Sequence, residues 1–143
     1  MAGKMLIVDA NSEWIQQAFA LRHEVFVVEQ RVPVELEIDE DDPAAMHLVL
    51  LQDAQVVATL RLVPYGDKIK IGRVAVRQQL RRQGLGTQLM LRGIRHAAES
   101  GFRAVFLDAQ VDSMPFYQGL GFIEEGDVFD DAGIPHVRMR LVL

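Results

Sequence analysis

The sequence has no cysteine among its 143 residues. This absence excludes disulfide bonds, thiolate metal sites and a cysteine nucleophile. Long apolar runs are also missing, because no stretch approaches the roughly 18 residues that a membrane-spanning helix needs, and we expect no membrane partner. Residues 1–14 carry one lysine and only a short apolar run before Asp9. Such a run is too brief for a secretory signal, so we expect a cytoplasmic protein.

Positive charge is in the minority, with 15 basic residues against 20 acidic ones and a net charge of −5. This balance argues against a nucleic-acid binder, whose affinity comes largely from cations on phosphates. The distribution is uneven: residues 70–103 hold eight basic residues and one acid, whereas 29–53 hold eight acids and one base and 108–131 hold seven acids and no base. The basic middle suits an anion site. We expect the acids of the flanking loops, including Asp39 to Asp42, to be solvated.

The order of elements predicts an α/β chain with one mixed sheet, in a single domain over residues 1–143. Apolar patterns and turn residues predict the order β-α-β-β-β-α-β-α-β-β, with several hairpins around one strand–helix–strand crossover. The expected elements are a strand at 5–10, a helix capped by Asn11 or Ser12, a loop at 32–45 with at most one helical turn, three strands within 46–76, a helix over about 84–100, a strand at 103–110, a short helix capped by Ser113, and two final strands around a turn at 130–133.

The most informative stretch is Arg81–Arg82–Gln83–Gly84–Leu85–Gly86, which follows an apolar strand and opens a helix. The first N–H groups of a helix lack internal partners and lie at the positive end of its dipole. Glycines allow a phosphate to approach those groups closely, and arginines add charge-assisted bonds. Two other phosphate motifs fit less well, because a Walker loop needs Gly-Lys-Ser/Thr and a dinucleotide fingerprint needs a third glycine where Leu89 stands. The pattern therefore predicts a pyrophosphate site.

Residues 74–89, "VAVRQQLRRQGLGTQL", resemble the acetyl-CoA-binding motif of the GNAT N-acetyltransferase superfamily. Residues 114–122, "MPFYQGLGF", resemble its later tyrosine-containing motif, and the spacing and element order agree over most of the chain. Residues 22–33, Ala109–Gln110 and residues 133–139 are similar to the ElaA-like branch. This resemblance implies the GNAT acyl-CoA N-acyltransferase fold with splayed central strands, and acetyl-CoA and an amine as substrates without any metal.

The resemblance also implies roles for individual residues. The strand at Val74, Ala75 and Val76 would pair with the pantetheine arm, as a peptide adds to a sheet edge. The remaining donor-binding residues implied by the motif are Arg81, Arg82, Gln83, Gly84, Leu85, Gly86, Thr87 and Gln110. Two departures stand out. Gln78 occupies a position where the family pattern has proline, and the asparagine often found before the tyrosine motif has no counterpart.

Tyr117 matches the position of the family's general acid, which protonates the departing thiolate, and we expect Phe116 to be its buried neighbour. The Val76 N–H would polarise the thioester carbonyl. Direct transfer is expected, since the chain has neither a cysteine nor a nucleophile elbow. The general base is left open: His136 titrates near neutrality and Glu29 would border the acceptor pocket. The remaining acids considered for this role are Asp39, Asp108 and Asp112.

The resulting hypothesis is an acetyl-CoA-dependent N-acetyltransferase that acts on a primary amine. One alternative is a non-catalytic acyl-CoA-binding or sensing module, and another is a nucleotide-binding regulator. The apolar last strand, residues 137–143, has two interpretations: it pairs with a second subunit in a homodimer, or it closes the sheet of its own chain.

Overall fold

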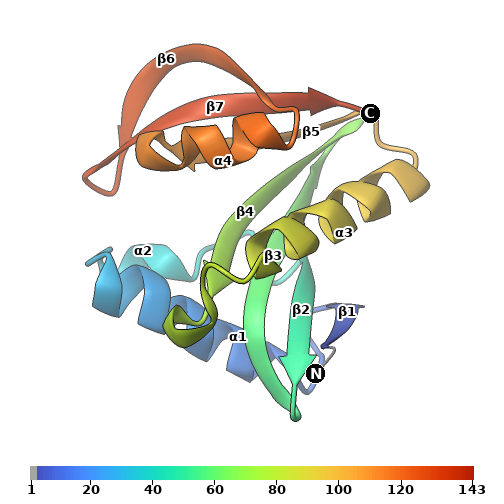
Figure 1. Cartoon of the computed structure of the whole chain (residues 1–143), viewed down its shortest axis with the longest axis vertical. Coiled ribbons are helices and arrows are strands. Elements are labelled where there is room, and N and C mark those ends of the chain that lie inside the picture. Colours follow the sequence, from blue (N-terminus) through green and yellow to red (C-terminus); the bar gives the residue numbers. More distant parts are fainter. Residues whose placement is uncertain (1–2) are drawn as a thin grey trace.

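A computed structural model describes residues 3–143 and contains a seven-stranded sheet in the order β1-β2-β3-β4-β5-β7-β6 (Figure 1). Neighbouring strands are antiparallel except β4 and β5, which run parallel. The strands are β1 (Lys4–Val8), β2 (Met46–Gln52), β3 (Gln55–Tyr65), β4 (Lys68–Val76), β5 (Ala104–Gln110), β6 (Ile123–Asp131) and β7 (Ile134–Val142). The expected mixed sheet is confirmed. Met1 and Ala2, which entered the expectation for the N-terminal segment, lie outside the described residues.

The helices agree with the expected order of elements. They are α1 (Ile15–Arg22), a π-helix (His23–Glu29) that continues it, α2 (Val34–Glu37), α3 (Leu85–Glu99) and α4 (Met114–Gly119). Single 3-10 turns at Gln78–Leu80 and Val111–Ser113 precede α3 and α4. Among residues 3–143, no helix combines the length and apolar character that crossing a membrane requires.

The start of α1 differs from the expected cap. Its N-cap residue is Trp14, which makes no side-chain cap bond. Ser12 instead stabilises the turn before the helix, because its hydroxyl accepts the Trp14 N–H at 3.1 Å and its carbonyl accepts the Ile15 N–H at 3.2 Å. Ser113 is the N-cap residue of α4, again without a side-chain bond.

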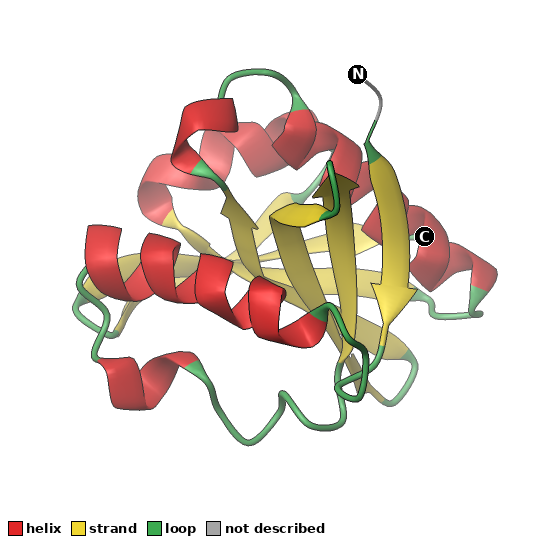
Figure 2. Ribbon diagram, turned by 90° about the horizontal axis from the view of Figure 1, so that it is seen from below, coloured by secondary structure: helices red, strands yellow, loops and turns green. Residues whose placement is uncertain are grey.

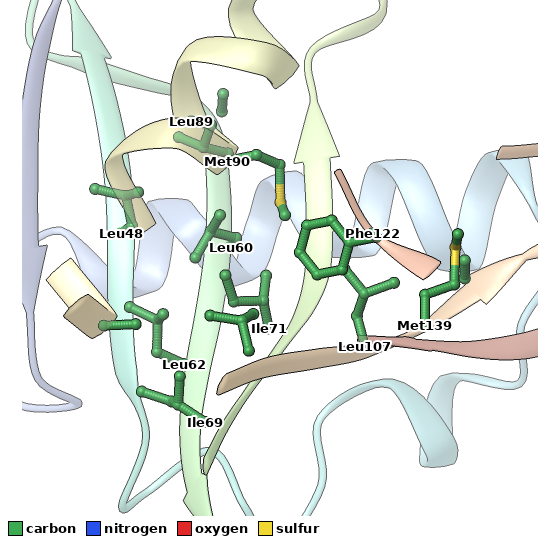
Figure 3. Close-up of a cluster of buried hydrophobic side chains, with 14 of the residues drawn as sticks. Leu48, Leu60, Leu62, Ile69, Ile71, Leu89, Met90, Leu107, Phe122 and Met139 are labelled. Atoms are coloured by element: carbon green, nitrogen blue, oxygen red, sulfur yellow. The ribbon is translucent and has the colours of Figure 1, made fainter. Parts of the chain in front are cut away.

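Helices cover the sheet on both sides (Figure 2). On the side that we call the α3 face, Leu89 and Met90 of α3 pack on Leu60 and Ile71 of the central strands, and all four side chains are buried (Figure 3). On the opposite side, the α1 face, Ala18, Leu21 and Val25 cover β2, β3 and the end of β4. Burial of a Leu or Ile side chain stabilises the fold by roughly 1.5–3 kcal/mol, so the two layers hold the central strands firmly.

The two parallel strands at the centre separate along their length. β4 pairs with β5 only through Lys68, Ile69 and Lys70, opposite Ala104 to Phe106. Beyond this point β4 remains paired with β3, as far as Val76, but has no pairing with β5. The splay implied by the family resemblance is therefore present, and it opens a cleft toward the carboxyl ends of both strands.

The last strand is not an edge strand. β7 pairs with β5 from His136 to Val142 and with β6 on its other side. The interpretation that residues 137–143 pair with a second subunit is therefore wrong, because both edges of β7 are taken within the chain. The open edge on this side of the sheet is β6, which carries several acidic side chains.

Candidate functional site

The cleft between β4 and β5 contains a pocket of about 210 Å³. Its walls come from the end of the π-helix, α2, the two splayed strands, α4 and the β6–β7 turn. Five of the residues singled out from the sequence line it: Val74, Asp108, Gln110, Tyr117 and His136. Residues far apart in the chain therefore meet where the parallel strands separate.

The loop before α3 has the shape expected of an anion site. Gly84 is the N-cap residue with φ 79°, and Arg82 also has a left-handed φ of 65°. Gln88 donates the first helical N–H bond, to the Gly84 carbonyl at 3.1 Å, so the preceding amides have no partner within the helix. A Cβ on Gly86 would lie 3.6 Å from the Phe116 ring, which brings α4 beside this loop.

The other residues of the predicted pyrophosphate motif divide between solvent and core. Arg82, Gln83 and Gly84 are exposed, Thr87 is half-buried, and Leu85 is buried in the core against the sheet. The Leu85 side chain therefore anchors the first turn of α3, while the backbone of this turn and the neighbouring arginine remain accessible to a ligand.

Arg81 has two partners that the sequence did not indicate. Its guanidinium donates to both carboxylate oxygens of Glu29, each at 2.8 Å, and its Nε donates to the Val76 carbonyl at 3.0 Å. The residue predicted to bind phosphate is thus paired with Glu29, one of the residues considered as the general base. Arg81 also caps the last carbonyl of β4, at the end of the cleft.

The next residue of the same segment reaches the opposite wall. The Gln30 side-chain oxygen accepts a bond of 2.7 Å from Gln110, at the end of β5. Glu29 and Gln30 therefore link the π-helix to both sides of the cleft. The π-helix, the left-handed Arg31 with φ 60° and these two links form a strained segment of the kind found at functional sites.

These contacts predict a measurable effect of Glu29 on donor affinity. If the donor's phosphates take Arg81 from Glu29, the Glu29→Gln variant should bind acetyl-CoA roughly two- to fivefold more tightly in calorimetry, since a partly exposed ion pair contributes up to about 1 kcal/mol. Glu24→Gln, an exposed acid on the same helix, is the matched control and should leave affinity unchanged. Weaker binding by Glu29→Gln would instead mean that Glu29 positions Arg81 for the donor.

Tyr117 lies on α4 with its ring half-buried and its edge in the pocket. Burial raises the pKa of its hydroxyl to about 12, so the group is protonated at neutral pH. The expectation of a buried Phe116 is wrong, because that ring is 38 % exposed although it lies 5.0 Å from the Tyr117 ring. The buried aromatic neighbour is Phe122, at 6.0 Å.

His136 is buried on β7, opposite Gln110, and stacks on Phe129 with the ring centres 6.0 Å apart. Its Nδ1 lies 2.7 Å from the Ile134 carbonyl. A carbonyl oxygen can only accept, so Nδ1 carries a proton, and in the neutral form of the ring the lone pair is on Nε2. This tautomer suits a proton acceptor at the pocket wall.

The acids weighed as bases are less suited to this role. Burial alone would raise the pKa of Asp108, but hydrogen bonds from Arg138 and Lys70 outweigh it and lower that pKa. The pKa of Asp39 is lowered in the same way, by Arg61 against the effect of burial. Both carboxylates are therefore weak proton acceptors held in ion pairs, while Asp112 is exposed.

The acids from the end of α2 onward are only partly solvated: Glu40 is exposed as expected, Asp39 and Asp41 are half-buried, and two others are buried. Glu37 and Asp42 are 3 % and 2 % exposed, and both bond to the guanidinium of Arg22, which is 1 % exposed. Arg61 and Arg73 join the same cluster through further ion pairs. The available signal was an arginine within the apolar β3 sequence, which calls for a buried acidic partner. Among residues 3–143, no group of histidines and acids could hold a metal ion.

Comparison with known proteins agrees with this geometry. The model of the GNAT acetyltransferase domain matches residues 9–143. An uncharacterised N-acetyltransferase of Bacillus subtilis, YjcF, is 35 % identical over 134 residues, which cover 93 % of this chain and 96 % of YjcF. A crystal structure of Escherichia coli ElaA has a TM-score of 0.87 at 31 % identity, covering 96 % of this chain and 98 % of ElaA.

A third relative is an acyl-CoA N-acyltransferase from Pseudomonas aeruginosa, whose crystal structure has a TM-score of 0.89 at 33 % identity. The alignment covers 97 % of this chain and 99 % of that one. The match therefore extends over nearly the whole of this chain, including the segments that form the cleft. The chain belongs to the GNAT acetyltransferase family, and ElaA is among its relatives.

Proposed function

We propose that this N-acetyltransferase moves an acetyl group from acetyl-CoA directly to a primary amine of a small molecule or a peptide. The observation that carries the proposal is the cleft between β4 and β5, which Tyr117 and His136 line, while the glycine loop of α3 follows the free end of β4. The glycine loop and the unpaired part of β4 would hold the donor, and Tyr117 and His136 would supply the proton donor and acceptor that thioester aminolysis needs.

The donor would lie along β4 and the α3 loop. We assign the pantetheine arm to Val74, Ala75 and Val76, since the β5 side of this stretch has no strand partner. The pyrophosphate falls to the segment from Arg81 to Thr87, where free amides and arginines coincide. Gln110 faces the arm from the end of β5.

In the proposed reaction the neutral amine attacks the thioester carbon, the C–N bond forms and the C–S bond breaks. The Val76 N–H stabilises the developing oxyanion. The ammonium proton leaves to His136 Nε2 or, once Arg81 is engaged by phosphate, to Glu29. Tyr117 donates its proton to the CoA thiolate, and its phenolate is reprotonated from solvent. The tautomer of His136 favours it over Glu29 as the base.

Calorimetry with acetyl-CoA and a thiol-release assay with amines test the proposal. Saturable donor binding and amine-dependent release of CoA are expected. Binding without release for any amine would favour the alternative of an acyl-CoA-sensing module. Absence of binding up to millimolar donor would reject both interpretations.

The Gly86→Glu variant should weaken acetyl-CoA binding at least tenfold, because a carboxylate then stands beside the phosphates at the helix N-terminus. The matched control is Ser100→Glu, which adds the same charge at the exposed opposite end of α3. The control should bind acetyl-CoA as the wild type does. Equal affinities for both variants would remove the α3 loop from the donor site.

A further inference from the structure

A second hollow of about 480 Å³ lies next to the pocket and shares Lys70 with it. The hollow is on the α1 face of the sheet. Val105 and Leu107 of β5 belong to the core on the α3 face, so Phe106 and Asp108 point the other way. The ribbon diagram shows that α1 and α2 lie over β2 to β4 and leave this part of the sheet without a helix on that side (Figure 1). The hollow is therefore open to a ligand that also enters the pocket.

The strand register places the polar side chains of this face at regular intervals from the reaction site. His136 pairs with Gln110 beside Tyr117, Arg138 pairs with Asp108, and Arg140 pairs with Phe106. Each step of two residues along a strand is about 7 Å. The guanidinium-bearing positions therefore lie roughly 7 and 14 Å from the His136 position along one strand, in a straight line from the reaction site.

The hollow carries an excess of positive charge, although the chain as a whole has a net charge of −5. Lys70 and Arg138 share a single carboxylate, Asp108, at 3.0 Å each. Lys68 has no carboxylate within ion-pair distance in the described part of the chain. Arg140 is balanced by an exposed acid. Because two cations share one carboxylate, some of their N–H groups remain able to donate hydrogen bonds to a ligand.

The floor of the hollow is aromatic. The Arg138 guanidinium carbon lies 5.0 Å from the centre of the Phe106 ring. The centre of the Tyr65 ring lies 5.6 Å from the centre of the same Phe106 ring. This cation–π contact and the ion pair with Asp108 hold the Arg138 guanidinium at the aromatic floor. The two rings, tilted by 60° to each other, offer apolar surface for the carbon chain of a ligand that extends between the pocket and the cations.

We propose that the acceptor is an amine that carries a carboxylate at its far end, bound by Arg138, Arg140 and the two lysines of this hollow. The inference rests on the proposed function, since it places the amine at Tyr117 and His136. The carboxylate belongs to a free ω-amino acid or to the C-terminus of a short peptide, and the two sources share this chemistry.

Thiol release with a graded set of acceptors tests the inference. The set consists of γ-aminobutyrate, ε-aminocaproate and ω-aminocaprylate, with hexylamine and hexamethylenediamine as matched neutral and cationic amines. At least tenfold higher kcat/KM is expected for the longer amino acids than for hexylamine, since hydrogen bonds between charged groups are stronger than those between neutral groups. Triglycine and its C-terminal amide distinguish the peptide source from the free amino acid. Equal or better use of hexamethylenediamine would overturn the proposal.

The Arg138→Gln and Arg140→Gln variants should each raise the KM for ε-aminocaproate about tenfold and leave kcat, and kcat/KM for hexylamine, unchanged. Arg95→Gln, on the exposed side of α3, is the control. Arg140 bonds only to an exposed acid, so this variant keeps the Asp108 pairs intact. An unchanged KM in both variants would overturn the proposal.

Calorimetry of ε-aminocaproate with the CoA-bound protein separates this inference from the reaction itself. Binding that both arginine variants lose supports the carboxylate site even if no amine releases thiol, and in that case only the proposed function fails. Turnover of amines without any preference for the carboxylate leaves the proposed function intact and overturns the inference.

Discussion

The Tyr117→Phe variant should turn over acetyl-CoA roughly 10²- to 10⁴-fold more slowly than the wild type and bind the donor equally well. The lost group is the single hydroxyl of a pocket-lining residue, and among residues 3–143 no hydrogen bond to it is found. The ring keeps its contacts with Phe116 and Phe122, so the fold should be unaffected. The kcat and the calorimetric Kd together test this expectation, with the thermal midpoint as the control.

The pH profile separates acid catalysis by Tyr117 from a packing role. Burial raises the pKa of Tyr117 to about 12, so its protonated form, which donates to sulfur, persists as the pH rises through the ordinary range for tyrosine. The wild-type rate should therefore show no loss from Tyr117 up to pH of about 10. An unchanged kcat in Tyr117→Phe would show that the thiolate leaves without this proton and would remove Tyr117 from the mechanism.

Local chemistry explains what could be predicted from the sequence. The β4–α3 segment combines a strand, a glycine loop and a helix within residues 68–99, and each part depends mainly on its own neighbours. The left-handed φ of Gly84 and the first turn of α3 follow from the residue types present. The same holds for the hairpin turns, where short polar and glycine-containing segments separate apolar strands.

Contacts between distant residues explain what could not be predicted. The pair Glu29–Arg81 joins positions 52 residues apart, and Arg22 meets Asp42 across 20 residues. Composition alone cannot tell a loop acid that is solvated from one that has a buried arginine as its partner. The internal place of β7 is likewise a matter of strand order, which the pattern of the strand does not contain. The acceptor side of the site is built largely from such contacts.

The buried cluster around Arg22 gives a second prediction with a large expected effect, here on the free energy of unfolding. The Arg22→Met variant should lower the free energy of unfolding by about 3–5 kcal/mol, because it leaves Glu37 and Asp42 as buried charges without their main partner. Chemical denaturation measures this loss. The matched control, Arg95→Met, removes an exposed arginine paired with Glu99 and should cost about 0.5 kcal/mol or less.

The dependence of folding stability on acidic pH tests whether the loss of the Arg22–Asp42 pair causes the destabilisation. Burial favours the neutral form of Asp42, but bonds from Arg22 and the Asp39 N–H outweigh it and lower the pKa of Asp42 from 3.8 to about 2. A lowered pKa adds stability above pH 4, here about 2 kcal/mol, and that stability is lost as the pH falls toward 2. Without Arg22 the pKa of Asp42 should rise, so unfolding by acid should begin at a higher pH in Arg22→Met. The same acid midpoint in both proteins would show that Arg61 and the backbone alone hold the carboxylate.

Because this cluster supports α2 and Arg73 at the pocket wall, the variant should also weaken acceptor binding before it unfolds.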